Sequence, residues 1–426
     1  MAKNIGILSL GCARNLVDSE VILDRLKHKG YEIIDLDSVG NYFSEGKLNV
    51  DVALVNTCAF IKEAKEESVQ AILDLIELKK QGKVKKIIVA GCLSQRYKER
   101  LFRQLPEVDA FLGVISLNHT QRCFRLTPSH YAYVKICEGC INNCSFCVIP
   151  KIKLRFTSRS PESIISEVKA LDSKGCSEIN LIGQDISAYG WDLDGKFRLA
   201  DLIKQILKNT ERINWVRLLY LSPQRLSDDV IKLIADSPRI VKYIDLPLQH
   251  INDRILKLMG RDASSSEIRE LIDKIRKRIP DVAIRTSLIV GFPTETEKEF
   301  NQLLEFVKEV KFERLGLFMY SREEDTEAYG FKGQVLRRVK QERYNTIMSC
   351  QQEIASQVNQ RQQGKTLKVL IEERQEGGLY IGRSQHDAPE VDGLVYVKSK
   401  RELPVGSFEE VKIVDTLEYD LVGEAQ

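Results

Sequence analysis

Apolar and polar residues alternate in two different rhythms over the first 125 residues of the chain. Short apolar runs predict strands, and longer segments with apolar residues every three to four positions predict amphipathic helices. The predicted strands are 4–11, 32–35, 51–57 and 86–91, and the predicted helices are 15–29 and 61–80. This alternation is typical of a doubly wound α/β domain, a parallel sheet with helices on both faces.

From residue 131 onward, a strand followed by a helix recurs about six times. Ser160 before Pro161 predicts the start of one of these helices, and Gly175 predicts its end. The predicted strands are 131–137, 178–184, 215–221, 243–249, 283–292 and 314–321, with helices such as 161–173, 264–278 and 295–310 between them. Six such units predict a partial TIM-like (β/α)6 barrel, whose functional groups lie at the carboxyl ends of the strands.

The last part of the chain has another pattern. A polar helix is predicted over 339–363, and short strands separated by Gly, Pro and charged turns follow it. These strands are predicted at 366–372, 379–383, 393–397 and 410–414, which indicates a small β-barrel. The chain is therefore predicted to contain three domains, at residues 1–125, 126–362 and 363–426.

Composition narrows the class of protein. The 426 residues include ten Cys and carry a net charge of +3, and no apolar run approaches the roughly 18 residues of a membrane span. We therefore expect a reduced, soluble, cytoplasmic protein without disulfides and without a membrane partner. The overall charge does not by itself indicate a nucleic-acid-binding protein, so local charge must decide.

A loop after the predicted strand 131–137 carries the clearest chemical signal. Cys140, Cys144 and Cys147 are spaced C-x3-C-x2-C, so three thiolates of one loop can hold three corners of a cubic iron-sulfur cluster. The fourth iron would remain open for a ligand. A zinc site with Cys137 as the fourth ligand is the alternative.

Cys12, Cys58 and Cys92 each follow a predicted strand of the first domain. Because the carboxyl ends of strands in a doubly wound sheet form the ligand-binding edge, we expect these three side chains to converge. A second cluster with three Cys ligands is the favoured interpretation. The alternative is that each is a small buried side chain that serves packing alone.

The spacing of the loop, with Phe146 before its last cysteine, resembles the radical S-adenosylmethionine superfamily. Together with the three earlier cysteines and the C-terminal β-module, it resembles the methylthiotransferases, which carry two 4Fe-4S clusters and a TRAM domain. The resemblance covers nearly the whole chain. It is strongest in residues 9–20, 56–61, 245–250, 289–293 and 318–324.

The resemblance implies that S-adenosylmethionine binds the open iron and yields a 5′-deoxyadenosyl radical, while a second S-adenosylmethionine methylates a sulfur at the other cluster. The radical role falls to Cys140, Cys144 and Cys147, and the sulfur-donor role to Cys12, Cys58 and Cys92. The cofactor carries the radical chemistry, because acid-base residues cannot remove a proton from an unactivated C–H bond at neutral pH. The expected contacts of S-adenosylmethionine are Phe146, Gln184, Val290 and Gly291.

Within this family, the chain is similar to the branch that methylthiolates the β-carbon of an aspartate of ribosomal protein uS12. The alternative substrate is a tRNA adenosine near the anticodon. Residues 364–426 contain 8 Lys plus Arg and 13 Asp plus Glu, so their net charge is 8 minus 13, or −5. An acidic module suits a basic ribosomal protein better than RNA phosphates. The implied partners are uS12, free or in the small subunit, an electron donor protein and a sulfur source, with RNA contacted only through the ribosome.

Two positions depart from the family pattern. Lys153-Leu154 stands where the family usually has Arg-Gly, and Cys137 replaces another small residue and is expected to pack without binding metal. No role is assigned to His119, His250, Cys123, Cys176 or Cys350. A non-enzymatic iron-sulfur scaffold and a zinc-stabilised RNA-binding module are the alternatives from other functional classes.

Overall fold

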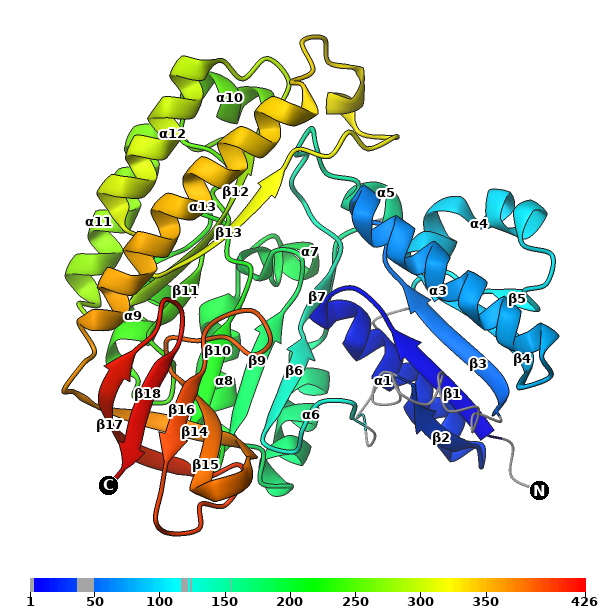
Figure 1. Cartoon of the computed structure of the whole chain (residues 1–426), viewed down its shortest axis with the longest axis horizontal. Helices are drawn as coiled ribbons and strands as arrows, with labels where there is room; N and C mark the ends of the chain where they lie inside the picture. The colour runs from blue at the N-terminus through cyan, green and yellow to red at the C-terminus, as the bar shows by residue number, and fades with distance from the viewer. Residues whose placement is uncertain (1–3, 37–49, 116–121, 123–124, 154) are drawn as a thin grey trace.

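The computed structural model of the chain describes most of its 426 residues. The described residues are 4–36, 50–115, 122, 125–153 and 155–426. The sequence positions His119, Cys123 and Leu154 discussed above lie outside them. Three units follow one another along the chain, an N-terminal sheet with helices, an open barrel and a small closed barrel (Figure 1).

The N-terminal unit is a parallel sheet in the order β2-β1-β3-β4-β5. Its elements are β1 (Asn4–Ser9), α1 (Ala13–His28), β2 (Glu32–Asp35), β3 (Val50–Thr57), α3 (Lys62–Lys80), β4 (Val84–Gly91), α4 (Cys92–Gln104) and β5 (Ala110–Phe111). Leu23 of α1 packs with Ile7 and Leu54, whereas α3 and α4 join a separate, larger core. Because the helices bury two different faces of the sheet, the predicted doubly wound fold is confirmed.

The open barrel consists of two three-stranded parallel sheets, β10-β9-β6 and β11-β12-β13. A bridge between Val216 and Ile240 and a hydrogen bond from Leu221 N to Asp245 O (2.9 Å) join the two sheets into one arc of six strands. Its helices lie on the outer side of the arc and share one large core with the strands (Figure 1). The predicted (β/α)6 arrangement is confirmed.

The elements of the open barrel have the following bounds. The strands are β6 (Tyr131–Lys135), β9 (Glu178–Ile182), β10 (Trp215–Leu218), β11 (Tyr243–Asp245), β12 (Ala283–Val290) and β13 (Arg314–Met319), with the short pair β7 (Cys137–Glu138) and β8 (Thr157–Ser158) beside them. The helices are α5 (Ile149–Lys153), α6 (Pro161–Ser173), α7 (Trp191–Asp194), α8 (Leu199–Lys208), α9 (Asp228–Asp236), α10 (Asp253–Leu258), α11 (Ser265–Arg278), α12 (Glu297–Val310) and α13 (Arg337–Gln360).

The C-terminal unit is a closed barrel in the order β14-β15-β16-β18-β17. Its strands are β14 (Thr366–Arg374), β15 (Leu379–Ser384), β16 (Val395–Lys398), β17 (Phe408–Thr416) and β18 (Leu421–Ala425). The small β-barrel is confirmed, but the last strand was not predicted. Gly423 lowers the strand signal there, and the structure needs it because a Cβ would lie 2.4 Å from Val411 Cγ1.

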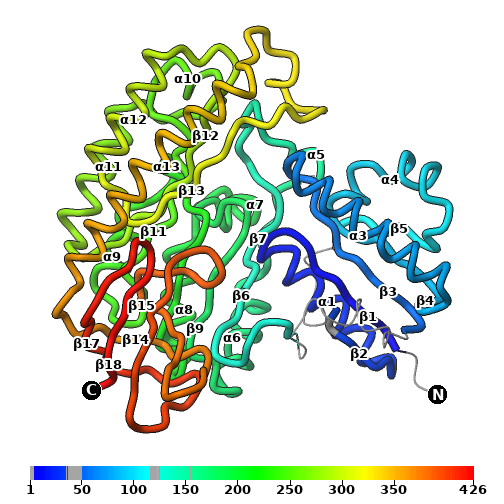
Figure 2. Tube along the Cα trace, in the orientation of Figure 1, coloured from blue at the N-terminus to red at the C-terminus, as the bar shows by residue number. Residues whose placement is uncertain are grey.

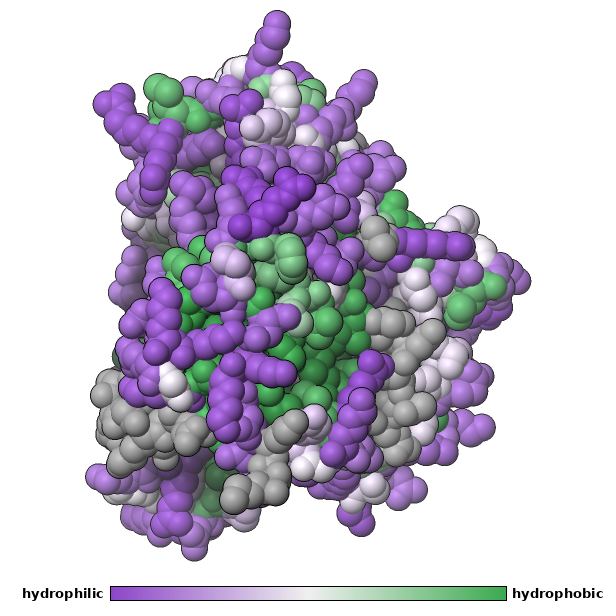
Figure 3. Space-filling model, turned by 90° about the vertical axis from the view of Figure 1, so that its right-hand side faces the viewer, coloured by the Kyte–Doolittle hydropathy of each residue, from purple (hydrophilic) through white to green (hydrophobic). Residues whose placement is uncertain are grey.

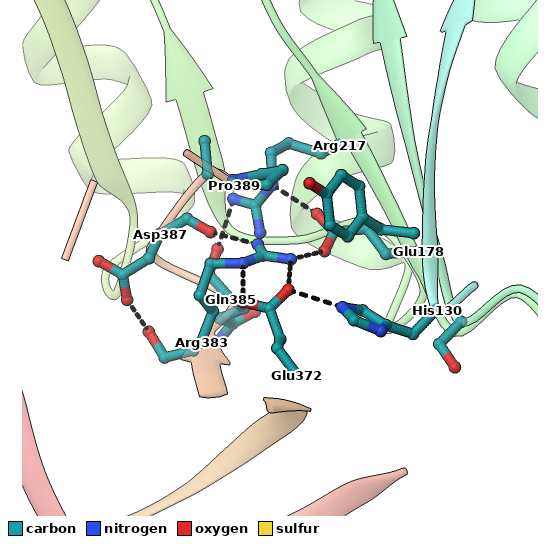
Figure 4. Close-up of polar contacts among 12 residues, drawn as sticks. His130, Glu178, Arg217, Glu372, Arg383, Gln385, Asp387 and Pro389 are labelled. Atoms are coloured by element: carbon teal, nitrogen blue, oxygen red, sulfur yellow. Dashed lines mark hydrogen bonds and ion pairs between the residues drawn. The ribbon is translucent and has the colours of Figure 1, made fainter. Parts of the chain in front are cut away.

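A buried network of charges fixes the closed barrel against the amino ends of the strands of the open barrel (Figure 4). Arg383 Nη2 donates to Glu178 Oε2 and to Glu372 Oε1, each at 2.7 Å. Arg217 Nε donates to the other oxygen of Glu178 at 2.8 Å, and His130 Nε2 lies 3.2 Å from Glu372 Oε1. The closed barrel thus covers the amino ends of the strands of the open barrel. The carboxyl ends of the open-barrel strands lie at the opposite end.

Helix α1 joins the N-terminal unit to the first strand of the open barrel. Val17 packs with Tyr131 and Tyr133, and Asp18 forms a buried ion pair with Lys135. The tube view shows α1 running beside β6, where the chain enters the barrel (Figure 2). The amino end of α1 is thereby placed near the carboxyl ends of the barrel strands.

The surface on the side of the N-terminal unit has an apolar region (Figure 3). Seen from that side, apolar residues gather near the middle of the molecule, and polar residues surround them (Figure 3). Among the residues that the structure describes, no helix has the length and apolar character needed to cross a membrane.

Candidate active site

The two sets of cysteines lie at strand ends of two different units, and one side chain bridges the gap between the units. Arg14, in the first turn of α1, donates from Nη1 to Gly183 O at 2.9 Å, just after β9. Its guanidinium carbon lies 4.4 Å from the ring centroid of Tyr220, two residues after β10. The carboxyl ends of the N-terminal sheet therefore face those of the open barrel.

The Cys140 loop is anchored on both sides to the barrel. Gly139 begins it with φ +80°, and a Cβ there would lie 2.9 Å from Arg155 O. Ser145 N donates to Met259 O at 3.0 Å, its Oγ donates to Leu258 O at 2.6 Å, and its own carbonyl accepts from Ala328 N at 2.8 Å. The cysteines on either side of Ser145 are thus held in fixed positions.

Polar donors point at the sulfur atoms of this loop. Asn142 directs its backbone N (3.4 Å) and its Nδ2 (3.3 Å) to Cys140 Sγ, and Arg261 Nη1 lies 3.7 Å from Cys144 Sγ. Burial raises the pKa of Cys140 and raises that of Cys147 to about 12. Buried thiols of this kind become thiolates only when a cation binds them, and N–H donors then stabilise the sulfur charge.

The second set lies at the ends of β1, β3 and β4. Cys12 is the residue that precedes α1, Cys58 follows β3, and Cys92 is the first residue of α4. The backbone is tightly packed there, because a Cβ on Gly11 (φ +95°) would lie 2.8 Å from Cys58 Cβ. The three strand ends are neighbours in the sheet, as predicted, and those of β1 and β3 flank the point where the strand order reverses.

Asn15 ties these strand ends together. Its Nδ2 donates to Leu10 O and to Thr57 O, both at 3.0 Å. Its Oδ1 accepts from Cys92 Sγ at 3.6 Å. One buried amide therefore fixes the carboxyl ends of β1 and β3 and orients the cysteine that follows β4.

The three thiols of this set differ in their electrostatics. Burial raises the pKa of Cys58, and it raises that of Cys92 to about 12, with further opposition from the charges of the neighbouring cysteines. Burial also opposes ionisation of Cys12, but the Arg14 guanidinium and nearby amides outweigh it and lower the pKa of Cys12. Arg14 Nε lies 3.4 Å from Cys12 Sγ.

Both sets suit iron-sulfur clusters. Each offers three buried or half-buried thiols, and N–H groups point at Cys12, Cys140 and Cys144. Within the described residues, no three His, Cys, Asp or Glu side chains lie close enough together to hold a single metal ion. A cubane places each thiolate on its own iron, so its ligands stand farther apart than those of one ion.

Cys137 lies in the core of the open barrel instead of facing the loop. It is fully buried, and its Sγ donates to Asp185 O at 3.6 Å. The thiol also fills the space beside Gly183, where a Cβ would lie 2.4 Å from the sulfur. Burial raises its pKa far above the ordinary value.

The four residues expected to contact S-adenosylmethionine have different surroundings. Gln184 donates from Nε2 to Glu138 Oε1 at 2.6 Å, and its buried Oε1 has no partner among the described residues. Phe146 is half-buried against the cluster that contains Ile289 and Phe292. These two side chains come from the cysteine loop and from the end of β9.

Val290 is the last residue of β12, and Gly291 follows it. The Val290 side chain is buried in the barrel core, so only its backbone faces other groups. Gly291 has φ +71°, and a Cβ there would lie 2.3 Å from Lys340 Cγ, so the close approach comes from α13. Gly291 N donates to Glu295 Oε2 at 2.8 Å. The role of these two positions stays a prediction.

The remaining histidine and cysteines behave as structural residues where they are described. His250 is fully buried, and its Nδ1 accepts from Asn252 N at 3.0 Å. Cys176 is buried and donates to Glu178 O at 3.2 Å, and Cys350 lies on α13. Lys153 is buried, with its Nζ 3.3 Å from Asp18 Oδ2.

Sequence reasoning missed the polar residues that surround the cysteines. Arg14, Asn15 and Asn142 each lie within three residues of a candidate ligand, so their position in the motifs was an available signal. Arg261 had no such signal. It reaches Cys144 from the segment after α10, a contact that only the folded barrel creates.

Sequence profiles of three families match the chain. The radical SAM superfamily matches residues 134–307, the TRAM domain matches residues 364–425, and the family described as uncharacterized protein family UPF0004 matches residues 4–113. The first two matches agree with the open barrel and the closed barrel. The third covers the N-terminal sheet.

Curated proteins named ribosomal protein uS12 methylthiotransferase RimO are similar to the chain over its whole length. The one from Desulforamulus reducens is 46% identical over 450 residues, which cover 99% of each chain. The one from Clostridioides difficile is 44% identical over 446 residues, which cover 99% of this chain and 98% of the relative.

Solved structures of radical S-adenosylmethionine methyltransferase TsrM from Kitasatospora setae have a similar fold. The structure with cobalamin and a [4Fe-4S] cluster bound has a TM-score of 0.57 and 12% identity, and the match covers 89% of this chain and 80% of that one. The structure with tryptophan and a cofactor analogue has a TM-score of 0.52 and 13% identity, over 74% and 73% of the chains. At such identities the likeness concerns the fold alone.

Proposed function

The chain belongs to the ribosomal protein uS12 methylthiotransferase RimO family, and we propose that it transfers a methylthio group to the β-carbon of an aspartate of ribosomal protein uS12. It is a radical S-adenosylmethionine enzyme that uses two 4Fe-4S clusters. The observation that carries the proposal is the pair of three-cysteine sets at facing strand ends, one in each α/β unit.

Each set has a separate role in this proposal. Cys140, Cys144 and Cys147 hold the cluster that binds S-adenosylmethionine, and their loop at the end of β6 supports this role. The N–H donors at Cys140 and Cys144 support thiolate ligands there. The cluster held there would supply the electron for reductive cleavage of S-adenosylmethionine.

Cys12, Cys58 and Cys92 hold the second cluster, which supplies the sulfur. Asn15 keeps the three strand ends in register by its hydrogen bonds to two backbone carbonyls. Arg14 donates to Cys12 and lowers the energy of its charged form. The packed helices α3 and α4 exclude water from the sheet beneath this set.

The S-adenosylmethionine contacts belong to the proposal as well. The unpaired Oε1 of Gln184 is suited to accept a hydrogen bond from the cofactor. Phe146 offers an apolar surface for the adenine, and Val290 and Gly291 offer backbone groups at the end of β12. Each of these roles is tested by the affinity for S-adenosylmethionine.

The proposed function also assigns a role to each domain, a cellular location and the partners. We assign the sulfur-donor domain to residues 1–125, the radical domain to 126–362 and the TRAM domain to 363–426. The enzyme works in the cytoplasm, with an electron donor protein and a sulfur source as partners. The acidic balance of residues 364–426 supports uS12, free or in the small subunit, as the substrate, with RNA contacted only through the ribosome.

The experiment is a methylthiolation assay under anaerobic conditions. The reconstituted enzyme is incubated with S-adenosylmethionine, a reductant and sulfide, and either uS12 or tRNA is added. We expect mass spectrometry to find a methylthio group on one aspartate of uS12 and none on tRNA. Modification of tRNA with uS12 unchanged would reject the proposed substrate.

A further inference from the structure

Cationic side chains surround the two cysteine sets, and most of them are neutralised by a carboxylate. Lys135 and Lys153 pair with Asp18 and Glu138, and Arg225 pairs with Asp185. Two guanidinium groups that contact a sulfur of these sets form no ion pair with any described carboxylate. They are Arg14, beside the second set, and Arg261, beside the Cys140 loop.

These two guanidinium groups differ in whether a terminal nitrogen remains without a hydrogen-bond partner among the described residues. Arg261 uses Nη1 toward Cys144 Sγ and Nη2 toward Pro247 O at 2.7 Å. Arg14 uses Nε toward Cys12 Sγ and Nη1 toward Gly183 O, and its Nη2 has no hydrogen-bond partner in the described part of the chain. Arg14 therefore keeps one terminal nitrogen for a ligand.

Glu138, the carboxylate whose charge acts on Arg14, does not pair with it. Glu138 is buried, and it already accepts from Lys135 Nζ at 2.5 Å and from Gln184 Nε2 at 2.6 Å. Lys153 Nζ lies 3.2 Å from the same carboxylate. Glu138 is thus fully engaged, and a positive charge at Arg14 remains without a carboxylate in a half-buried site.

Arg14 is also held in a fixed orientation. Its guanidinium stacks on the ring of Tyr220 while it bridges Cys12 and Gly183. The side chain therefore spans from the second set to the carboxyl ends of β9 and β10. A planar guanidinium that is fixed in this way is preorganised for a carboxylate, because little rotamer entropy is lost on binding.

We propose that Arg14 binds the side-chain carboxylate of the substrate aspartate. This inference rests on the proposed function and names the group that selects its substrate side chain. Because Arg14 reaches from Cys12 to Gly183, a carboxylate on Nη2 would bring the adjacent β-carbon near the second set and the carboxyl ends of the barrel strands. Arg14 is thus a specificity residue, because an asparagine presents no charge for it to bind.

The test is a double-mutant cycle that measures binding without turnover. Peptides of uS12 with the target aspartate or with asparagine in its place are titrated into anaerobically reconstituted enzyme without reductant. We expect the wild-type enzyme to bind the aspartate peptide at least about tenfold more tightly, and Arg14→Gln to bind both equally. Arg100→Gln, an exposed arginine of α4, is the matched control and should keep the wild-type preference.

Several results would overturn the inference. One is an Arg14→Gln enzyme that still prefers the aspartate peptide. Another is that Arg14→Gln loses only iron content. A third is that it loses only affinity for S-adenosylmethionine, because the carboxylate of that cofactor would then be the group that Arg14 binds. Arg14→Lys keeps the charge without the planar fork, so it provides a second variant if Arg14→Gln does not fold. It should retain part of the preference.

Failure of the inference and failure of the proposed function are distinguishable. If the wild-type enzyme methylthiolates uS12 but the cycle finds no coupling with Arg14, only the role of Arg14 is wrong. If the wild-type enzyme neither binds nor modifies uS12, the proposed substrate is wrong.

Discussion

The two cysteine sets are built in different ways. Cys140, Cys144 and Cys147 lie within eight residues of one loop, which is anchored to the barrel through Ser145. The second set draws one residue from each of three strand ends, so its geometry depends on the whole N-terminal sheet. Local spacing defines the first set, whereas tertiary structure defines the second. The first should therefore tolerate disturbance of the sheet, and the second should not.

The largest effect is expected from Cys144→Ala. Loss of one ligand from the loop should abolish both 5′-deoxyadenosine formation and methylthiolation, because no radical forms without this cluster. The iron content should fall by about half, since the sheet still holds its own cluster. Chromatography of the nucleoside products and iron analysis measure the two effects. Continued 5′-deoxyadenosine release at the wild-type rate would contradict the assignment of the loop.

Cys58→Ala should separate the two halves of the reaction. We expect methylthiolation to stop while reductive cleavage of S-adenosylmethionine continues, because the loop is intact. The iron content should again fall by about half. An assay for 5′-deoxyadenosine beside the assay for modified uS12 checks this difference. Unchanged iron content would show that Cys58 serves packing alone.

Asn15→Ala tests whether the second set depends on the sheet. The substitution leaves the carbonyls of Leu10 and Thr57 without their donor, at a cost of about 1 to 3 kcal/mol. Iron bound by the second set should become labile to chelators, while radical formation is retained. Asn142→Ala is the matched variant at the loop and should reverse this pattern. Equal effects of both variants on both clusters would refute the contrast between the sets.

The buried ion pairs that Glu138 forms with Lys135 and Lys153 predict a pH dependence. Burial opposes ionisation of Glu138, but Lys135 and Lys153 outweigh it and lower its pKa to about 2 from an ordinary 4.5. Its stabilisation is thus complete above about pH 4.5 and is lost as the pH falls toward 2. Urea unfolding of cluster-free protein should lose up to about 3 kcal/mol over this interval. Glu138→Gln should flatten that part of the profile, and a profile as steep as the wild type would contradict this cause.

The smallest effect is expected from Cys137→Ser. The thiol lies in the barrel core beside Gly183, away from the loop, and a hydroxyl can still donate to Asp185 O. We expect wild-type iron content and activity, with a loss of about 1 kcal/mol or less in the free energy of unfolding. Loss of metal together with activity would restore the four-ligand zinc interpretation.

The sequence allowed the order of units and both cysteine sets to be predicted, because spacing and strand ends are properties of short segments. Some boundaries differ for local reasons. Helix α12 was predicted from residue 295 but begins at Glu297, since Thr296 caps it in a capping box with Glu299. That signal was present in the sequence. Strand β18 was missed because Gly423 serves packing against β17, which no local pattern reveals.

The polar surroundings of the site were harder to predict. Arg14 contacts Gly183 and Tyr220, which are more than 160 residues away along the chain. Arg261 reaches Cys144 only when the segment after α10 packs beside the loop in the folded open barrel. Such contacts depend on how whole units pack together, so the local sequence of one segment does not predict them.

Iron and inorganic sulfide analysis of the anaerobically reconstituted wild-type chain tests the central claim most directly. Two sets of three cysteines that each hold a cubane predict about eight irons and about eight sulfides per chain. About four of each would mean that one set binds no cluster, and stoichiometric zinc in place of iron would contradict the account as a whole.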